Sequence, residues 1–215
     1  MATRSTTAVP RRQRARRGDG ELLRAQILEA AGRLLAETGS EDAVSIRAVA
    51  DAVGVTPPSI YLHFPDKDAL ITAVCSERFR EFDALLEAAG AQSSDPVESL
   101  RLRGPAYVRF GMESPEHYRV LFMTRNEHGL DEPGHEAGTA AFTHLVEAVQ
   151  RCIDAGAIRA SEPLLVAIGV WATMHGITSL LISLPNFPWP DVDTLVTHAV
   201  DTYLSGLAPG QFSRT

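Results

Sequence analysis

The stretch at residues 44–70, VSIRAVADAVGVTPPSIYLHFPDKDAL, decides the fold. Ser45 is a good helix N-cap, and the apolar residues that follow it recur at helical spacing. Gly54 ends this helix, because glycine adopts the left-handed conformation without a Cβ penalty. Thr56 then caps a short second helix that has Pro57 at its first position. Two helices joined by a glycine-containing turn form a helix-turn-helix, whose second helix can enter the DNA major groove.

This stretch resembles the TetR family of bacterial one-component repressors. The resemblance covers about residues 27–74. It rests on two motifs, the Ser45-Ile46-Arg47-x-Val49-Ala50 helix and the Tyr61-x-His63-Phe64-x-x-Lys67 segment. It implies a repressor that acts as a homodimer on a palindromic operator of double-stranded DNA. It also implies that a small-molecule effector releases the DNA.

The surface that contacts DNA, here called the reading head, should lie around the second helix of the helix-turn-helix. Hydroxyl groups there can bond base edges or phosphates, and proline rings can touch thymine methyl groups. Arg47 is the best candidate for a guanine or minor-groove contact, and Lys67 resembles the family's backbone clamp. The alternative for each polar residue is plain surface. The predicted DNA-binding residues are Ser45, Arg47, Thr56, Pro57, Pro58, Ser59, Tyr61, His63 and Lys67, whereas Ile60, Leu62 and Phe64 are expected to face the core.

The charge distribution agrees with nucleic-acid binding only in the N-terminal part of the chain. The chain carries a net charge of −7, but residues 1–65 hold nine arginines and seven acids, a charge of +2, and the remainder holds −9. Six of those arginines precede Gly18. We expect residues 1–19 to be disordered in the free protein. They either lie along phosphates or in a minor groove, or form a solvated tail.

Length and composition indicate a cytoplasmic protein with a real core. The 215 residues suggest one or two domains, and a hydrophobic content of 45% is enough to form a hydrophobic core. No apolar run has the length and purity of a membrane helix, and no secretory signal is evident. Cys75 and Cys152 fit no CxxC pattern, so both are expected to be reduced, buried thiols.

The rest of the chain is expected to be helical, because no segment alternates as a half-buried strand should. The predicted fold class is therefore all-α. We divide the chain into an arginine-rich arm, a helix-turn-helix domain, and a helical effector-binding and dimerisation domain, at 1–19, 20–68 and 69–215. Expected helices cover 21–38, 66–89, 96–112 (with a kink at Pro105), 114–124, 137–155, 163–184 and 191–207.

The helix at 163–184 is apolar nearly all round, so it should be buried on several sides. Its small residues fall on one stripe and would let another helix approach closely. With the last helix, it is predicted to pair with its copy in a four-helix dimer interface, as in TetR-like proteins. The alternative is packing within one chain. The predicted interface residues are Gly169, Ala172, Gly176, Leu195, Ala199 and Tyr203.

Trp171-x-x-x-His175-Gly176 is similar to a Trp-His-Gly signature found in one type of effector domain within the family. Trp171 and His175 share a helix face, so they either line a pocket or form ordinary core. The effector is expected to be a hydrophobic or amphipathic small molecule. The predicted pocket residues are Tyr107, Phe110, Phe122, Met123, Phe142, Trp171 and His175, with Met112 as a further wall candidate.

The sequence gives little support for a metal site or an enzyme. The segment 128–136, HGLDEPGHE, has metal-binding side chains but no specific ligand spacing, so no metal or other cofactor is expected. No nucleophile elbow, P-loop or HExxH motif is present, so an enzyme is not expected. A constitutive DNA-binding dimer without an effector remains the second hypothesis. A well-formed cavity in the second domain would favour sensing over this alternative.

Overall fold

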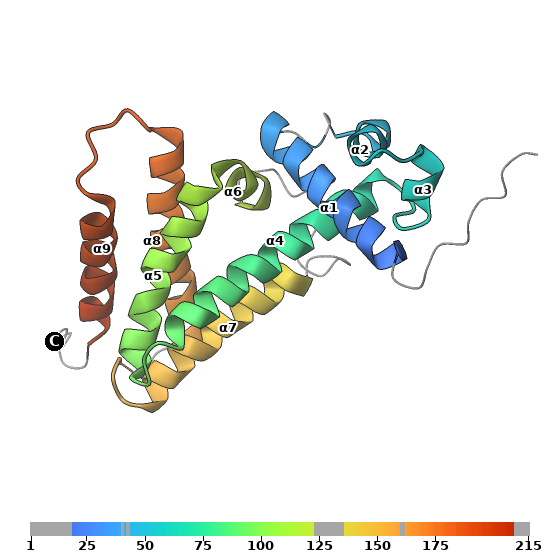
Figure 1. The fold of residues 1–215 in the computed structure, drawn as a ribbon. Coiled ribbons are helices and arrows are strands. Elements are labelled where there is room, and N and C mark those ends of the chain that lie inside the picture. Colours follow the sequence, from blue (N-terminus) through green and yellow to red (C-terminus); the bar gives the residue numbers. More distant parts are fainter. Residues whose placement is uncertain (1–18, 40, 42–43, 123–135, 160–161, 209–215) are drawn as a thin grey trace, which may run out of the picture.

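The computed structural model describes residues 19–39, 41, 44–122, 136–159 and 162–208, and the regular elements among them are helices (Figure 1). The predicted all-α fold is thus confirmed. The helices are α1 (Asp19–Thr38), α2 (Ile46–Val53), α3 (Pro57–Tyr61), α4 (Lys67–Gly90), α5 (Pro96–Glu113), α6 (Pro115–Phe122), α7 (Glu136–Asp154), α8 (Pro163–Ser183) and α9 (Val192–Leu207).

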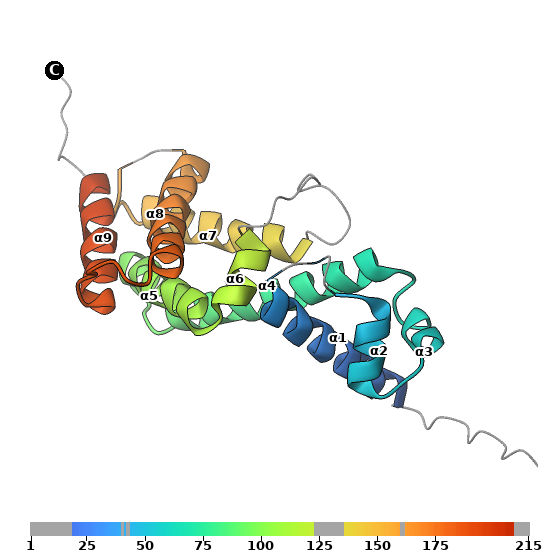
Figure 2. The same ribbon diagram turned by 90° about the horizontal axis from the view of Figure 1, so that it is seen from above.

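The first three helices and the start of α4 share one hydrophobic core. Ile27, Val49, Ile60 and Leu70 are each fully buried there, and the cluster continues along α4 as far as Val74. Because α4 then enters the second core, it belongs to both halves of the molecule. Figures 1 and 2 show it as the long helix that joins the two.

The caps expected at Ser45 and Gly54 are confirmed. The hydroxyl of Ser45 accepts a hydrogen bond from the Ala48 amide at 3.1 Å. Gly54 adopts φ +76°, a conformation that side chains rarely allow, and so ends α2. The carboxylate of Asp66 accepts from the Ala69 amide at 2.7 Å and starts α4. Local sequence signals therefore set this part of the fold.

Two expectations for the reading head are wrong. Thr56 occupies the N-cap position of α3 but makes no side-chain cap; its hydroxyl lies 3.3 Å from that of Ser59. Leu62 does not face the core, since its side chain is 83% exposed. Ile60 and Phe64 are buried as expected, because residues four apart share one face of a helical turn. The residue between them points to the opposite side.

In the second domain, α5 and α7 pack against the distal part of α4, α8 packs on α5 and α7, and α9 packs on α5 and α8. In Figure 1, α7 runs beside α4, and α5 lies between α4 and α9. The short helix α6 lies between this domain and α1, and it contacts α1, α4 and α5. It is a second connection between the two halves, besides α4.

Contrary to the expectation from the sequence, one helix of the described residues, α8, is long and apolar enough to cross a membrane. A core helix of a helical domain has the same composition. Here α8 packs against α5, α7 and α9, and Val166, Ala167, Met174 and Leu181 are buried. Its remaining apolar side chains form part of a cavity wall and an exposed face.

Candidate DNA-binding surface and effector cavity

The nine residues predicted to bind DNA all have accessible surface. They belong to α3, the start of α2, the start of α4 and the turns between them. Tyr61 is 52% exposed although it is a large aromatic residue. The exposed members of the set are Ser45, Arg47, Thr56, Pro58 and Tyr61, and the partly exposed members are Pro57, Ser59, His63 and Lys67.

The start of α1 lies beside this surface. A Cβ on Gly20 would be 3.9 Å from Cε1 of His63, and the Arg24 guanidinium lies 5.2 Å from the centre of the Phe64 ring. The free amide groups and dipole of a helix N-terminus attract phosphate. The α1 start and the α3 surface therefore form one face suited to a DNA backbone. The predicted arm, up to residue 18, lies outside the described residues.

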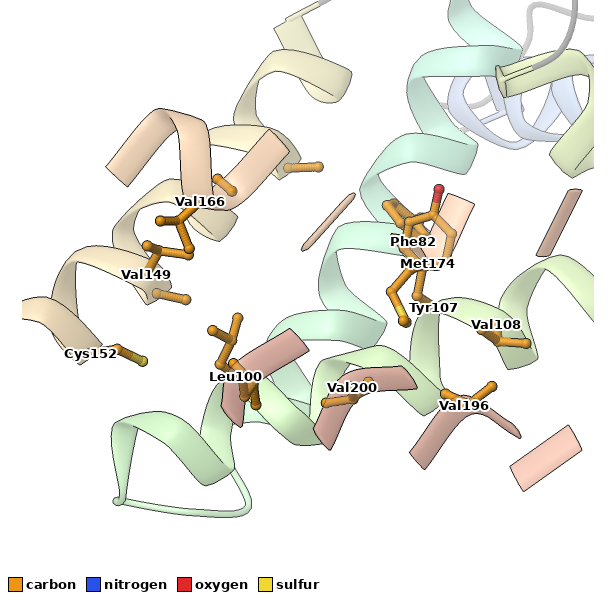
Figure 3. Close-up of a cluster of buried hydrophobic side chains, with 14 of the residues drawn as sticks. Phe82, Leu100, Tyr107, Val108, Val149, Cys152, Val166, Met174, Val196 and Val200 are labelled. Atoms are coloured by element: carbon orange, nitrogen blue, oxygen red, sulfur yellow. The ribbon is translucent and has the colours of Figure 1, made fainter. Parts of the chain in front are cut away.

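The second domain encloses a cavity of about 600 Å³, a volume typical of small-molecule sites. Its walls come from α4, α5, α6, α7, α8 and α9, and they are mainly apolar. Figure 3 shows three of its lining residues, Phe82, Tyr107 and Met174, grouped together and apart from Val149 and Val166. The structural feature expected of a sensor is thus present.

The cavity includes some of the predicted pocket residues and excludes others. Tyr107, Phe122, Phe142 and Trp171 line it. Met123 lies outside the described residues, as does the segment 128–136 apart from Glu136. The predictions for Phe110 and His175 require correction, since neither is among the lining residues. Phe110 instead packs against Phe82, with 5.0 Å between ring centres.

His175 is a hydrogen-bonded histidine of the interior. Its Nδ1 lies 2.7 Å from the Tyr118 hydroxyl, and its Nε2 lies 3.3 Å from the Ser179 hydroxyl. Burial lowers the pKa of His175, so the neutral imidazole is favoured. A neutral ring that accepts at Nδ1 and donates at Nε2 satisfies both partners.

A chain of hydrogen bonds connects the cavity wall to α6. Trp171 Nε1, which can only donate, lies 3.3 Å from the Tyr107 hydroxyl, and that hydroxyl lies 3.0 Å from the Tyr118 hydroxyl. Tyr118 then donates to His175. Burial raises the pKa of Tyr107 and Tyr118, so both phenols stay protonated. Sequence reasoning missed Tyr118, whose partners lie far away in the chain.

Charged residues form one edge of the cavity, and sequence reasoning missed them too. Asp83 and Glu87 lie one turn apart on α4. His144 Nδ1 is 2.9 Å from both carboxylate oxygens of Asp83, and Arg103 donates to Glu87 at 2.8 Å. Donor atoms of Asp83, Glu87 and His144 lie within 4.8 Å of one another, a set that suits a transition metal. Hydrogen bonds from His144 and Arg103 already engage the two carboxylates.

Two predicted dimer residues pack within the chain instead. A Cβ on Gly169 would lie 1.9 Å from the Tyr203 hydroxyl oxygen, which donates to the Val166 carbonyl at 3.2 Å. Gly169 is therefore small to admit Tyr203 of α9, and Tyr203 also lines the cavity. This corrects the interface prediction for both residues in favour of the intrachain alternative.

The other predicted interface positions leave one face of α8 uncovered. Ala172 is exposed, and a Cβ on Gly176 would meet nothing within 4 Å. On α9, Leu195 and Ala199 are half-buried. Several large apolar side chains accompany Ala172 on α8, of which Leu165 is the most exposed at 66%; the others are Leu164, Ile168, Trp171 and Leu180.

The fold, the reading head and the cavity define a helix-turn-helix regulator with a separate effector domain. Comparison with known families agrees. Residues 27–74 match the family described as bacterial regulatory proteins of the tetR family, and residues 100–203 match the tetracyclin repressor-like C-terminal domain. The chain belongs to the TetR family of DNA-binding transcriptional regulators.

Individual proteins resemble the chain over different extents. The HTH-type transcriptional regulator EthR of Mycolicibacterium smegmatis is 32% identical over 113 residues, which span 53% of this chain and 48% of that regulator. A protein of unknown function from Rhodococcus sp. RHA1 is 30% identical, with a TM-score of 0.78 over 86% of this chain and 95% of its own. The regulator FadR of Bacillus subtilis, solved in complex with stearoyl-CoA, is 18% identical, with a TM-score of 0.73 over 85% of this chain and 98% of its own.

Proposed function

We propose that the protein is a ligand-released repressor that binds a palindromic operator as a homodimer. The observation that carries this proposal is the cavity of about 600 Å³, whose walls include α4 and α6, the two helices that also contact α1 of the DNA-binding head. The apolar lining suits a hydrophobic or amphipathic effector. The FadR neighbour, which has the same fold, was solved in complex with stearoyl-CoA, an amphipathic molecule.

In this proposal the DNA-binding head reads the major groove with α3. Tyr61 and the start of α4 contact the phosphates, and the start of α1 contributes its amide groups. Arg47 reaches a base or the minor groove. Because charged contacts are few on this surface, Tyr61 and the helix N-termini contribute a large share of the affinity.

The partner for the exposed apolar face of α8 is a second copy of the chain. A two-fold operator requires two reading heads related by a two-fold axis. Leu165, Ile168, Ala172 and Leu180 provide apolar contact area, and the open space above Gly176 allows close approach. Uncovered apolar surface of this kind marks interaction sites.

The effector acts by selecting a conformer in which the two heads have the wrong spacing. One path runs along α4, which takes part in both cores. The other runs through α6, because Tyr118 belongs to the hydrogen-bond chain of the cavity wall and the neighbouring His117 contacts α1. Operator affinity falls by the difference in effector affinity between the two conformers.

A cavity-filling variant tests this proposal without a known effector. Ala141 of α7 is buried and lines the cavity, whereas its neighbour Ala140 is exposed. Ala141→Trp should occupy the cavity and weaken operator binding on the order of tenfold, a typical coupling between sites. Ala140→Trp adds the same side chain outside and should bind as the wild type does.

Equal operator affinity for the two variants, with both folded by circular dichroism, would contradict the sensing mechanism. It would favour the alternative of a constitutive DNA-binding dimer without an effector. The presence of the cavity favours sensing. As a member of a family of transcriptional regulators, the protein is proposed to have no enzymatic role and to act on DNA in the cytoplasm.

A further inference from the structure

The charges along one edge of the effector cavity do not balance. Among the described residues that line it, Asp83, Glu87 and Arg103 are charged. The remaining lining residues are apolar or neutral, and most are aromatic or aliphatic. The cavity edge therefore has two carboxylates and one guanidinium. The hydrogen-bond partner of each group determines which charge is left to bind a ligand.

Arg103 and Glu87 neutralise each other. The Arg103 guanidinium donates to Glu87 at 2.8 Å and to the Leu86 carbonyl at 2.9 Å. It is packed so closely against α4 that a Cβ on Gly90 would lie 2.4 Å from its central carbon. The Arg103 side chain is 8% exposed, so it is held as a clamp on the end of α4.

Asp83 has a weaker partner. Both of its carboxylate oxygens lie 2.9 Å from His144 Nδ1, a group that carries charge only when it is protonated. The His144 side chain is 42% exposed and so can turn toward solvent, whereas the Asp83 side chain is 19% exposed. Above the pKa of His144, the cavity edge keeps one uncompensated negative charge at Asp83.

Aromatic rings line the same cavity as this charge. Phe79, Asp83 and Glu87 follow one another at four-residue spacing, so they lie along one face of α4. Phe82, Phe142 and Trp171 line the same cavity. The faces of aromatic rings attract cations, most strongly where water is excluded. A half-buried carboxylate in a cavity lined by aromatic rings therefore favours a positively charged group.

We propose that the effector is a lipophilic amine, whose ammonium group binds Asp83 in place of His144 and whose apolar part lies among the aromatic rings. This inference rests on the proposed function, since it assigns the chemical class of the effector. An ammonium group donates to both oxygens of Asp83. Its approach releases His144 of α7 from α4, which changes a contact between two helices of the cavity wall.

An anionic effector is the competing class. It would need a cation that is free to pair, and the Arg103 guanidinium is already engaged by Glu87 and by a helix carbonyl. Of the three guanidinium nitrogens of Arg103, Nε alone lacks a hydrogen-bond partner among the described residues. An anion would also meet the carboxylate of Asp83 across the same cavity. The charges along this edge of the cavity therefore disfavour an anionic effector.

Three probes with the same twelve-carbon chain separate these classes: dodecylamine, 1-dodecanol and dodecanoate. Binding to the full chain is measured by calorimetry at pH 8, below micelle-forming concentrations and without DNA. We expect dodecylamine to bind on the order of tenfold more tightly than dodecanol, because a charged hydrogen bond is added. Dodecanoate should bind more weakly than dodecanol.

Asp83→Asn keeps the shape of the side chain and removes its charge. It should abolish the preference for the amine while leaving dodecanol binding unchanged. Glu81→Gln removes the same charge from an exposed position of α4, where Glu81 pairs with Arg78, and should keep the preference. Circular dichroism confirms that both variants fold.

Equal or tighter binding of dodecanoate would overturn the proposal, as would an Asp83→Asn variant that still prefers the amine. Failure of all three probes to bind would overturn it as well. The proposed function fails differently: the amine would then bind through Asp83 without changing operator affinity. The two proposals can therefore be told apart.

Discussion

Nε2 of His117 lies 3.3 Å from the carbonyl oxygen of Gly32, so α6 of the effector domain is hydrogen-bonded to α1 of the DNA-binding head. Burial, followed by the charge of Arg78, lowers the pKa of His117, so a neutral ring donates to this carbonyl. The next residue, Tyr118, takes part in the hydrogen-bond chain of the cavity wall. Two adjacent side chains thus connect the cavity wall to the DNA-binding head.

Replacing His117 by alanine should uncouple the cavity from DNA binding. In the Ala141→Trp background, the roughly tenfold loss of operator affinity should shrink several-fold, because the contact between α6 and α1 is missing. The affinity of the single His117→Ala variant should stay near that of the wild type. A double-mutant cycle by fluorescence anisotropy measures this. His117→Gln keeps a donor and serves as the control; additive effects of His117→Ala and Ala141→Trp would refute the role of α6.

Tyr61→Ala should weaken operator binding roughly tenfold or more, as expected for loss of a phosphate or base contact. The fold should be unaffected, because the Tyr61 side chain is 52% exposed. Phe187→Ala is the matched control: Phe187 is 53% exposed and lies in the loop between α8 and α9. Anisotropy titrations that show equal losses for both variants would place the reading head elsewhere.

Two glycines of α8 should respond oppositely to alanine. Gly169→Ala forces a methyl group onto the Tyr203 ring and should lower the free energy of unfolding by ~1–3 kcal/mol. Gly176→Ala enters open space and should raise it by up to ~1 kcal/mol through helix propensity, provided that protein concentration keeps the chain monomeric. Urea denaturation measures both. A stable Gly169→Ala variant would contradict the packing of α8 on α9.

Leu165→Glu should separate the proposed dimer into folded monomers. The Leu165 side chain is 66% exposed in the single chain, so a charge there has little effect on the monomer but opposes burial against a second copy. Light scattering after size exclusion gives the mass. Ala91→Glu, an exposed position after α4, should remain dimeric. A dimeric Leu165→Glu variant would mean that this face of α8 is not the interface.

The pair of His144 and Asp83 should make stability depend on pH. The hydrogen bond to Asp83 raises the pKa of His144 above its ordinary value of about 6.5, with Glu87 and Glu147 acting in the same direction. The pair therefore stabilises the fold at pH values below about 6.5, the pKa of His144 in the unfolded chain. This stabilisation is lost as the pH rises through the raised pKa of the folded state. Thermal unfolding should show wild type about 2 °C more stable than His144→Asn at pH 5.5, since the pair is exposed. The difference should vanish at high pH; a difference that grows with pH would contradict this sign.

The helices and the caps of the helix-turn-helix at Ser45 and Gly54 could be predicted from the sequence, because the signals there are local. Ser45, Gly54 and Asp66 act within three or four residues of themselves, so each can be interpreted without knowing the tertiary fold. The error at Leu62 came from applying a strand-like alternation to a helical turn. A period of 3.6 residues would have placed Leu62 opposite Ile60 and Phe64.

The site in the second domain was less predictable, because its contacts join distant segments. Tyr118 and His175 are 57 residues apart in sequence, and Asp83 and His144 are 61 apart. Nothing in the local pattern pairs them. Gly169 was expected at a dimer contact but packs against Tyr203 of the same chain. The cause is the same, because a small residue favours close packing without specifying the partner.

The most direct test is a mobility shift of the purified protein with the DNA upstream of its own gene, with competitor DNA and a salt titration. We predict a saturable, competitor-resistant complex with a two-fold footprint, which Tyr61→Ala weakens. Binding that competitor DNA removes and that falls steeply with salt, with no protected site, would contradict a sequence-specific regulator of this DNA.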